Sequence, residues 1–261
     1  MRQLSGVLME SATDDGAAAA YRAAGIVLDL DRGLDGRAWS LYALGSIGYG
    51  NYLAGWSDID LDVVITSPRT ETREDLVRLG EQLSEAAHTA GHPDIDVKCF
   101  HIDELGGAPV PTLYGVANRQ VMFLDSAVHL HGLDIRDRIP RPTHNVLRAE
   151  AHRIATALAE MDLQWWDTRP LDDLAALLAL PARLLYTART GEVVDKKRAL
   201  ECLLNEDAKG LPADSWAWCS WALACRFSPA VRRLPEQHGG QARAAARAAL
   251  KWVAAHPEVA A

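Results

Sequence analysis

Apolar residues alternate with polar ones along several short stretches of the first half of the chain, and recur at helical spacing between them. Alternation predicts half-buried strands, and a spacing of three to four residues predicts amphipathic helices. The pattern predicts strands at 38–44, 58–66, 94–101 and 120–124, and helices at 8–28 and 73–90. Residues 45–57 are predicted as a loop or a short helix. This part of the chain is therefore expected to combine a sheet with helices.

The hydrophobic pattern and the composition change at the Pro140-Arg141-Pro142 break. After it, strand-like runs disappear and Ala, Leu, Arg and Trp dominate. Helical spacing predicts helices at 145–163, 171–190, 195–206, 214–226 and 239–255. The expected fold class is α+β, with a mixed sheet and helices in residues 1–140 and an all-α bundle in residues 141–261. Both parts have an ordinary domain size.

Composition narrows the class of partner. The chain has 261 residues, 49% of them hydrophobic, which is enough for a substantial core. Its formal net charge of −8 argues against a protein that mainly grips nucleic acid, because binding phosphates requires Lys and Arg. A negative cleft attracts cations instead, so a small cationic substrate is expected.

The cysteines and the hydropathy of the chain indicate the cellular compartment in which the protein is expected. The four cysteines form no CxxC pair and have no zinc-like spacing, which is typical of reduced thiols in the cytoplasm. The N-terminus lacks the apolar run of a signal peptide, and no segment approaches the roughly 20 apolar residues that span a membrane. A cytoplasmic protein with no membrane partner is expected.

The segment LGSIGYGNYLAGWSDIDLDVVI, residues 44–65, carries the clearest chemistry. Side chains at i and i+2 of a strand share a face, so Asp58 and Asp60 can hold one hard cation together. Mg²⁺ is commonly bound by one or two carboxylates plus substrate phosphates. Gly45 permits close approach of the backbone to a ligand, and Ser46 offers a hydroxyl and an N–H to phosphate oxygens. A nucleoside triphosphate with Mg²⁺ fits this pattern.

A third carboxylate is needed to share a second metal ion or to deprotonate an attacking hydroxyl. Asp96, flanked by apolar residues in the third predicted strand, is favoured as both metal ligand and base, and Asp94 is the alternative. Asp62 continues the alternation from Asp60, so mutual repulsion calls for a metal or a basic partner, for which Lys98 is suited. Asp62 is interpreted as a support for the site and not as a metal ligand.

These residues resemble the signature of the DNA polymerase β-like nucleotidyltransferase superfamily, in which hG[GS] is followed by Dx[DE]. A second segment, PARLLYTARTGEVVDKKRALECLL, resembles a motif in the helical domain of streptomycin- and spectinomycin-type aminoglycoside adenylyltransferases. The matching residues are Arg183, Tyr186, Thr187, Thr190, Gly191, Val193, Lys196 and Ala199.

The resemblance implies an adenylyltransferase of antibiotic resistance, with two Mg²⁺ ions and ATP as co-substrate. Gly45, Ser46 and Ser57 would contact the triphosphate, and Asp58 and Asp60 would bind Mg²⁺. Lys196 would reach the β- or γ-phosphate and neutralise charge on the leaving pyrophosphate.

Two departures from the family pattern concern the acceptor. Leu185 stands where streptomycin-type members have Trp, and the acid near the third strand is Asp96 where they have Glu; Glu104 is the nearest Glu. The acceptor is therefore expected to be spectinomycin, another aminocyclitol, or a different amino sugar or antibiotic. Trp166 and Asp167 combine an apolar wall with a carboxylate, which suits a polycationic sugar.

Two other classes remain open on the sequence. A nucleotidyltransferase of toxin–antitoxin type would modify a protein or a tRNA, and a non-catalytic nucleotide-binding regulator would only bind. The acidic net charge speaks against tRNA, and the intact motif residues, such as Asp58 and Asp60, speak against a decayed site. A monomer can be complete if the helical half closes the cleft.

Overall fold

The chain folds into two units that divide between Arg141 and Pro142, except that residues 115–118 group with the second unit. The computed structural model describes residues 14–29, 34, 37–54, 57–105, 115–168, 174–207, 209–225 and 238–260. The first residues of the predicted helices at 8–28 and 171–190 lie outside these ranges, as does the last residue of the one at 214–226.

Unit 1 is built on a four-stranded mixed sheet with the order β3-β2-β1-β4. Its strands are β1 (Trp39–Ala43), β2 (Ile59–Ile65), β3 (Ile95–His101) and β4 (Val128–His131). Strands β2 and β3 run parallel, whereas β1 runs antiparallel to both β2 and β4. The unit is of α+β class, as the sequence predicts.

The fourth strand is not where the sequence pattern places it. Residues 120–124 belong to helix α5 (Val116–Ser126), and the strand that pairs with β1 is β4, just beyond that helix. The prediction was wrong because a short apolar run fits a buried helix turn as well as a buried strand. Phe123 of this run is fully buried, and it packs against Tyr42 of β1.

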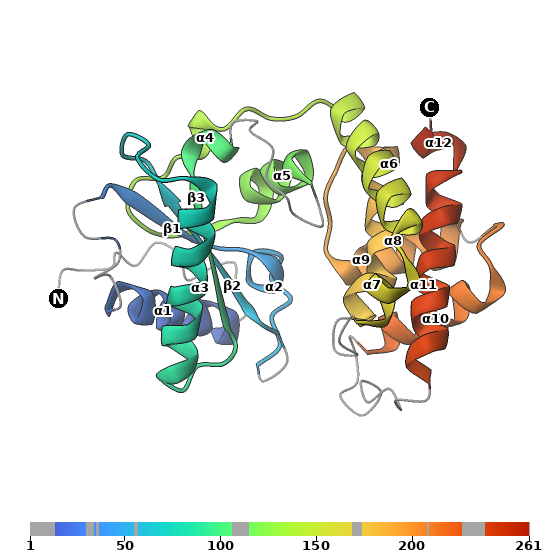
Figure 1. Cartoon of the computed structure of the whole chain (residues 1–261), viewed down its shortest axis with the longest axis horizontal. Helices are drawn as coiled ribbons and strands as arrows, with labels where there is room; N and C mark the ends of the chain where they lie inside the picture. The colour runs from blue at the N-terminus through green and yellow to red at the C-terminus, as the bar shows by residue number, and fades with distance from the viewer. Residues whose placement is uncertain are drawn as a thin grey trace. The chain divides into compact units, whose positions relative to one another are not determined.

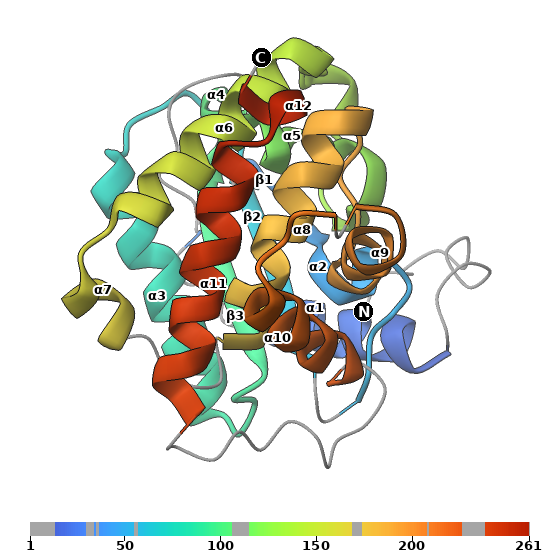
Figure 2. The same ribbon diagram turned by 90° about the vertical axis from the view of Figure 1, so that its right-hand side faces the viewer.

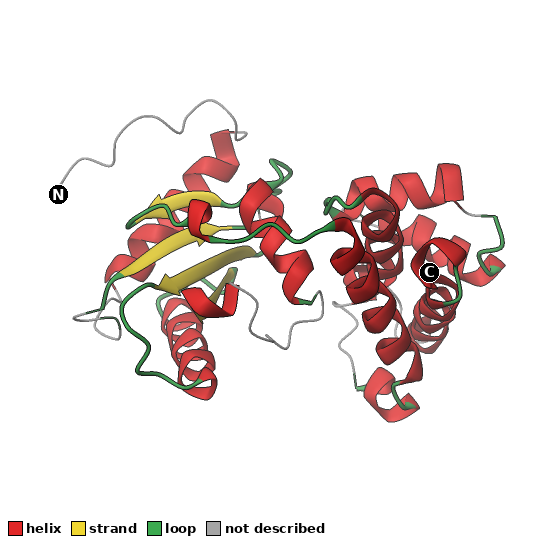
Figure 3. Cartoon of the chain, turned by 90° about the horizontal axis from the view of Figure 1, so that it is seen from above, coloured by secondary structure: helices red, strands yellow, loops and turns green. Residues whose placement is uncertain are grey.

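Helices cover both faces of the sheet (Figure 3). Alternate residues of the strands, among them Leu61, Val63 and Val97, share one core with α1 (Asp14–Asp29) and α3 (Arg73–Thr89). The other residues of the strands face the side of α4 (Ile102–Leu105) and α5, where Tyr42 and Val64 join a smaller core. This second face also carries the even-numbered acids of β2, and α5 packs against it.

Local sequence signals set the main helix of unit 1. Thr72 accepts a hydrogen bond from the backbone N–H of Asp75, and the Asp75 carboxylate caps the Thr72 N–H in return, which is a capping box. Gly80 lets α3 lie close to β3, since a Cβ there would stand 2.8 Å from the carbonyl oxygen of Val97. The helix is thereby seated firmly on the strand that carries Asp96.

In unit 2 the elements described after Pro142 are helical. They are α6 (His144–Glu160), α7 (Leu163–Asp167), α8 (Leu174–Thr190), α9 (Lys196–Cys202), a π-helical turn at Leu203–Asp207, α10 (Ala213–Ala224), α11 (Gly239–Ala254) and α12 (Pro257–Ala260). Helices α6, α8 and α11 pack side by side around an Ala- and Leu-rich core (Figure 2). Over the described ranges, no helix combines the length and hydropathy that a bilayer crossing demands.

Candidate functional site

Four charged side chains form a square on one face of the sheet. The parallel register of β2 and β3 sets Asp60 beside Asp96 and Asp62 beside Lys98. Because these positions are separated by two residues along each strand, all four side chains start from the same face. The strands and connections that support them can be followed in Figure 1.

Lys98 bridges two of the three carboxylates in this square. Its Nζ lies 2.5 Å from Oδ2 of Asp96 and 3.4 Å from Oδ1 of Asp60. Burial lowers the pKa of Lys98, but the carboxylates of Asp60 and Asp96 outweigh this effect, and the pKa ends above its ordinary value. The lysine therefore stays charged between the two acids.

The alternative acid, Asp94, lies elsewhere. It precedes β3, and its Oδ2 is 3.7 Å from Nη2 of Arg22 on α1. The structure thus brings Asp96, and not Asp94, next to Asp60.

Asp62 binds a different cation from the one the sequence suggests. Its carboxylate is 1% exposed and receives both of its hydrogen bonds from Nη2 of Arg119, on α5. The Arg119 guanidinium also lies 4.1 Å from the centre of the Phe100 ring. Burial raises the pKa of Asp62 above its ordinary value, and Arg119 opposes that shift. Asp62 therefore ties α5 to the sheet, in keeping with a supporting role.

Sequence reasoning missed Arg119 for a traceable reason. With residues 120–124 taken as a strand, Arg119 falls before the strand with no predicted neighbour. On a helix, residues three and four apart share a face. A helical interpretation places Arg119 and Phe123 on one face, which is the face that α5 turns toward the sheet.

Gly45 begins the short helix α2 (Gly45–Gly48) directly beside Asp60. Its φ is +60°, and a Cβ built there would lie 2.2 Å from Oδ2 of Asp60. The backbone N–H of Leu44 also donates to the carbonyl oxygen of Asp60 over 2.9 Å. Only glycine fits this position, because it accepts a positive φ and leaves room for the carboxylate.

Two hydroxyl groups lie next to the glycine turn and the carboxylates. The Ser46 Oγ is buried and has no hydrogen-bond partner in the described part of the chain. Burying an unpaired hydroxyl is unfavourable, so this Oγ can take a hydrogen bond from a ligand or from water. The Ser57 Oγ accepts a hydrogen bond of 3.1 Å from the Leu53 N–H, and this closes the loop before Asp58.

The carboxylates fit one divalent ion better than two. Asp58 is exposed and Asp60 is half-buried, and each carries the hard oxygen donors that Mg²⁺ prefers. Between Asp60 and Asp96, however, lies the Lys98 ammonium. Within the ranges that the structure describes, no three His, Cys, Asp or Glu side chains gather as a metal site.

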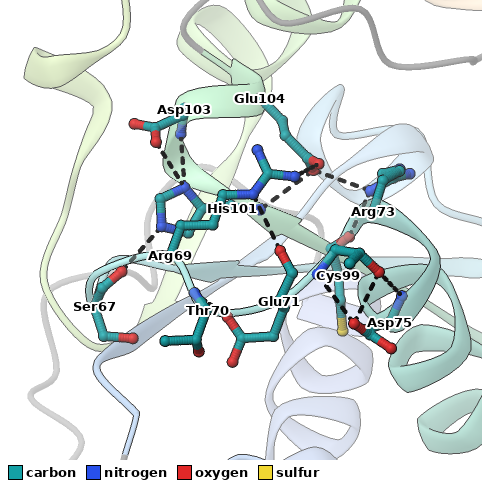
Figure 4. A network of polar contacts seen from close by, with 11 residues as sticks. Ser67, Arg69, Thr70, Glu71, Arg73, Asp75, Cys99, His101, Asp103 and Glu104 are labelled. Carbon is teal, nitrogen blue, oxygen red and sulfur yellow. Dashed lines mark hydrogen bonds and ion pairs between the residues drawn. The ribbon is translucent and has the colours of Figure 1, made fainter.

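Glu104, the glutamate nearest to the third strand, has a structural role (Figure 4). It is 3% exposed, and its two oxygens accept hydrogen bonds from Arg69 (3.1 Å) and Arg73 (3.0 Å). The backbone N–H of His101 also donates to Oε2. Because its oxygens are bound by two guanidinium groups, Glu104 is poorly suited to accept a proton from a substrate.

The helical motif of unit 2 forms a helix end and the start of the next helix. Helix α8 ends at Thr190, and Gly191 follows with a φ of +73°, its N–H bonded to the carbonyl of Thr187. This is the usual place of glycine after a helix. Asp195 then caps α9, whose first residue is Lys196.

Several motif residues form hydrogen bonds within unit 2 and so stabilise its fold. The Arg183 Nε donates to the Val194 carbonyl over 3.1 Å, and the Tyr186 hydroxyl donates to Glu192 over 3.2 Å. Lys196 is partly exposed and forms no ion pair with any residue in the described ranges. Its predicted contact with a phosphate stays a prediction.

Trp166 and Asp167 differ in exposure. The Trp166 ring is 2% exposed and belongs to the core of unit 2, with Trp165 packed edge-on against it. Because the ring is buried, Trp166 is poorly placed to form the wall of an open substrate site. The sequence alone does not reveal which way the ring points. Asp167 is exposed at the end of α7, and its role stays a prediction.

Comparison with known proteins yields a similar fold and no sequence relative. No protein-family model matches the chain, and no curated protein matches its sequence. The structure resembles the crystal structure of spectinomycin adenyltransferase AAD(9) from Enterococcus faecialis with ATP and spectinomycin, with a TM-score of 0.58 at 16% identity. The match covers 89% of this chain and 99% of that one. The chain therefore has an aminoglycoside adenylyltransferase-like fold.

Proposed function

We propose that this protein is a Mg²⁺-dependent nucleotidyltransferase that moves AMP from ATP to a hydroxyl of a small cationic acceptor, releasing pyrophosphate. The observation that carries the proposal is the contact of Asp60 with the Gly45–Ser46 turn. Gly45 is packed against Asp60 so closely that no Cβ fits between them. A nucleotide phosphate seated on that turn would lie beside the carboxylates.

The chain's own groups supply the phosphate contacts. The first N–H groups of α2 have no acceptor within the helix, as at any helix start, and they can bind phosphate oxygens. The Ser46 hydroxyl, buried and unpaired among the described residues, would gain its partner on binding. Ser57 and Lys196 complete the proposed contacts on the strength of the motifs that contain them. Asp58 and Asp60 would hold Mg²⁺, which supplies charge neutralisation at the phosphates.

Asp96 is the proposed general base. In the step, the acceptor hydroxyl oxygen bonds to the α-phosphorus of ATP, and the bond from that phosphorus to the leaving pyrophosphate oxygen breaks. The hydroxyl proton passes to a carboxylate oxygen of Asp96. Lys98 holds this carboxylate at 2.5 Å, so the base is oriented before the substrate arrives.

The proposed acceptor is an aminocyclitol or aminoglycoside antibiotic. A net charge of −8 favours a cationic substrate, and Asp167 is a proposed contact for its amino groups. The similar fold was solved with spectinomycin, which supports testing that class first. Leu185 and Asp96, which depart from the pattern of streptomycin-type enzymes, place streptomycin second.

The test is transfer of label from ATP labelled at the α-phosphate to a panel of aminocyclitols and aminoglycosides, with pyrophosphate measured in parallel. Asp60→Ala should abolish both signals, whereas Asp137→Ala, an exposed acid in the short turn at Arg136–Arg138, should leave them unchanged. Label in protein or tRNA, with none in any antibiotic, would move the function to a macromolecular acceptor. Nucleotide binding without pyrophosphate release from any acceptor would favour a regulator.

A further inference from the structure

Lys98 is not among the residues predicted to bind a metal ion or phosphate, yet it lies between two of the carboxylates of the site. It is 42% exposed, so its stem could carry the ammonium into solvent, yet Nζ turns between Asp60 and Asp96. Asp62, its neighbour by strand register, is bound by Arg119. The contact thus joins the metal-binding carboxylate to the proposed base.

We propose that the Lys98 ammonium takes the place of a second divalent cation, so that this site works with one Mg²⁺ ion. The inference rests on the proposed function and goes beyond it, since two metal ions are the usual arrangement for such transfers. Lys98 acts through Asp60 and Asp96 and is therefore a positioning residue.

The two oxygens of Asp60 separate the two cations. Oδ1 faces Lys98 at 3.4 Å, and Oδ2 faces Gly45, where a Cβ would come within 2.2 Å. Asp58 and Asp60 would hold the one metal ion, which would supply charge neutralisation at the phosphates. On the side of Asp60 that faces Asp96, the Lys98 ammonium already supplies a positive charge.

Charge balance points the same way. Asp60 and Asp96 share the single ammonium of Lys98, and Asp62 is bound separately by Arg119. The negative charge between Asp60 and Asp96 therefore already has a cation. A second divalent ion would have to displace Lys98 from a contact of 2.5 Å or share the space with it, and like charges this close repel strongly.

The experiment counts bound Mn²⁺, used in place of Mg²⁺, on protein saturated with the non-reacting analogue α,β-methylene-ATP. Equilibrium dialysis gives Mn²⁺ and nucleotide per chain in the same sample. Electron paramagnetic resonance distinguishes an isolated Mn²⁺ from a magnetically coupled pair, which two-metal sites hold at about 3.5–4 Å. The variants are Lys98→Met, which removes the charge, and Lys98→Arg, which keeps it. The control is Lys251→Met, an exposed lysine in the last turn of α11.

We expect one isolated Mn²⁺ per chain for the wild type, Lys98→Arg and Lys251→Met, and a coupled pair for Lys98→Met. Two Mn²⁺ ions on the wild type, or one on a folded Lys98→Met, would overturn the inference while leaving the proposed function intact. Absence of nucleotide from the wild type would overturn the proposed function and the inference with it. Circular dichroism identifies an unfolded variant, and Lys98→Arg then decides, since a coupled pair there contradicts the inference.

Discussion

Replacing Gly45 by alanine tests whether the glycine turn positions Asp60. An alanine at a φ of +60° is strained by about 1–2 kcal/mol, the usual cost of a left-handed backbone for a residue with a Cβ. In addition, the new Cβ would lie 2.2 Å from Oδ2 of Asp60, where real Cβ atoms do not come within 3.0 Å. The carboxylate must therefore move by about 0.8 Å, which is close to the 1 Å misplacement that can cost about 10²-fold in rate.

Gly91 offers a matched control. Its φ is +91°, and a Cβ built there has no atom within 4 Å, so Gly91→Ala carries the backbone strain without the steric contact. Gly91→Ala should lose about 1–2 kcal/mol in urea unfolding, and Gly45→Ala should lose at least as much, because it adds the steric contact to the same strain. Only Gly45→Ala should also lose about 100-fold in AMP transfer and weaken Mn²⁺ binding.

The comparison has a clear refuting result. If Gly45→Ala transfers AMP and binds Mn²⁺ as well as Gly91→Ala does, Asp60 does not depend on the turn, and the argument from the missing Cβ fails. Loss of transfer in both variants would trace the effect to general destabilisation.

Three further predictions concern charges. Arg119→Met should destabilise the protein by about 3–5 kcal/mol in urea unfolding, because it leaves the buried Asp62 carboxyl without the partner that binds it; the double variant with Asp62→Leu should recover part of the loss, and equal losses would contradict the pairing. The hydrogen bond from Arg136 lowers the pKa of Asp134 from 3.8 to about 2. The contribution of Asp134 to the stability of the fold is therefore present above pH 3.8 and is lost as the pH falls toward 2. The stability difference between wild type and Asp134→Asn should shrink over that range, and a constant difference would count against it. Lys196→Met should raise the KM for ATP severalfold with unchanged unfolding, whereas Lys197→Met should not; equal KM values would remove Lys196 from the site.

Much of unit 1 follows from the sequence alone. Alternating apolar residues located the first three strands, and apolar residues at helical spacing located the long helix α3, each to within one residue at either end, because burial of one face leaves a period in the sequence. The same period placed Asp60 and Asp62 on one face, and it did so for Asp96 and Lys98 in the neighbouring strand. These relations are local, so each can be derived from spacing along a single strand.

Only the tertiary structure decided which cation meets which carboxylate. Register makes Lys98 the neighbour of Asp62, but Arg119 of α5 takes Asp62, and Lys98 turns to Asp60 and Asp96. The contact of Gly45 with Asp60 and the burial of Trp166 were equally outside the reach of spacing. The reason is physical: a side chain's partner depends on competition among all charged and apolar groups that the fold brings near, and those groups come from distant parts of the chain.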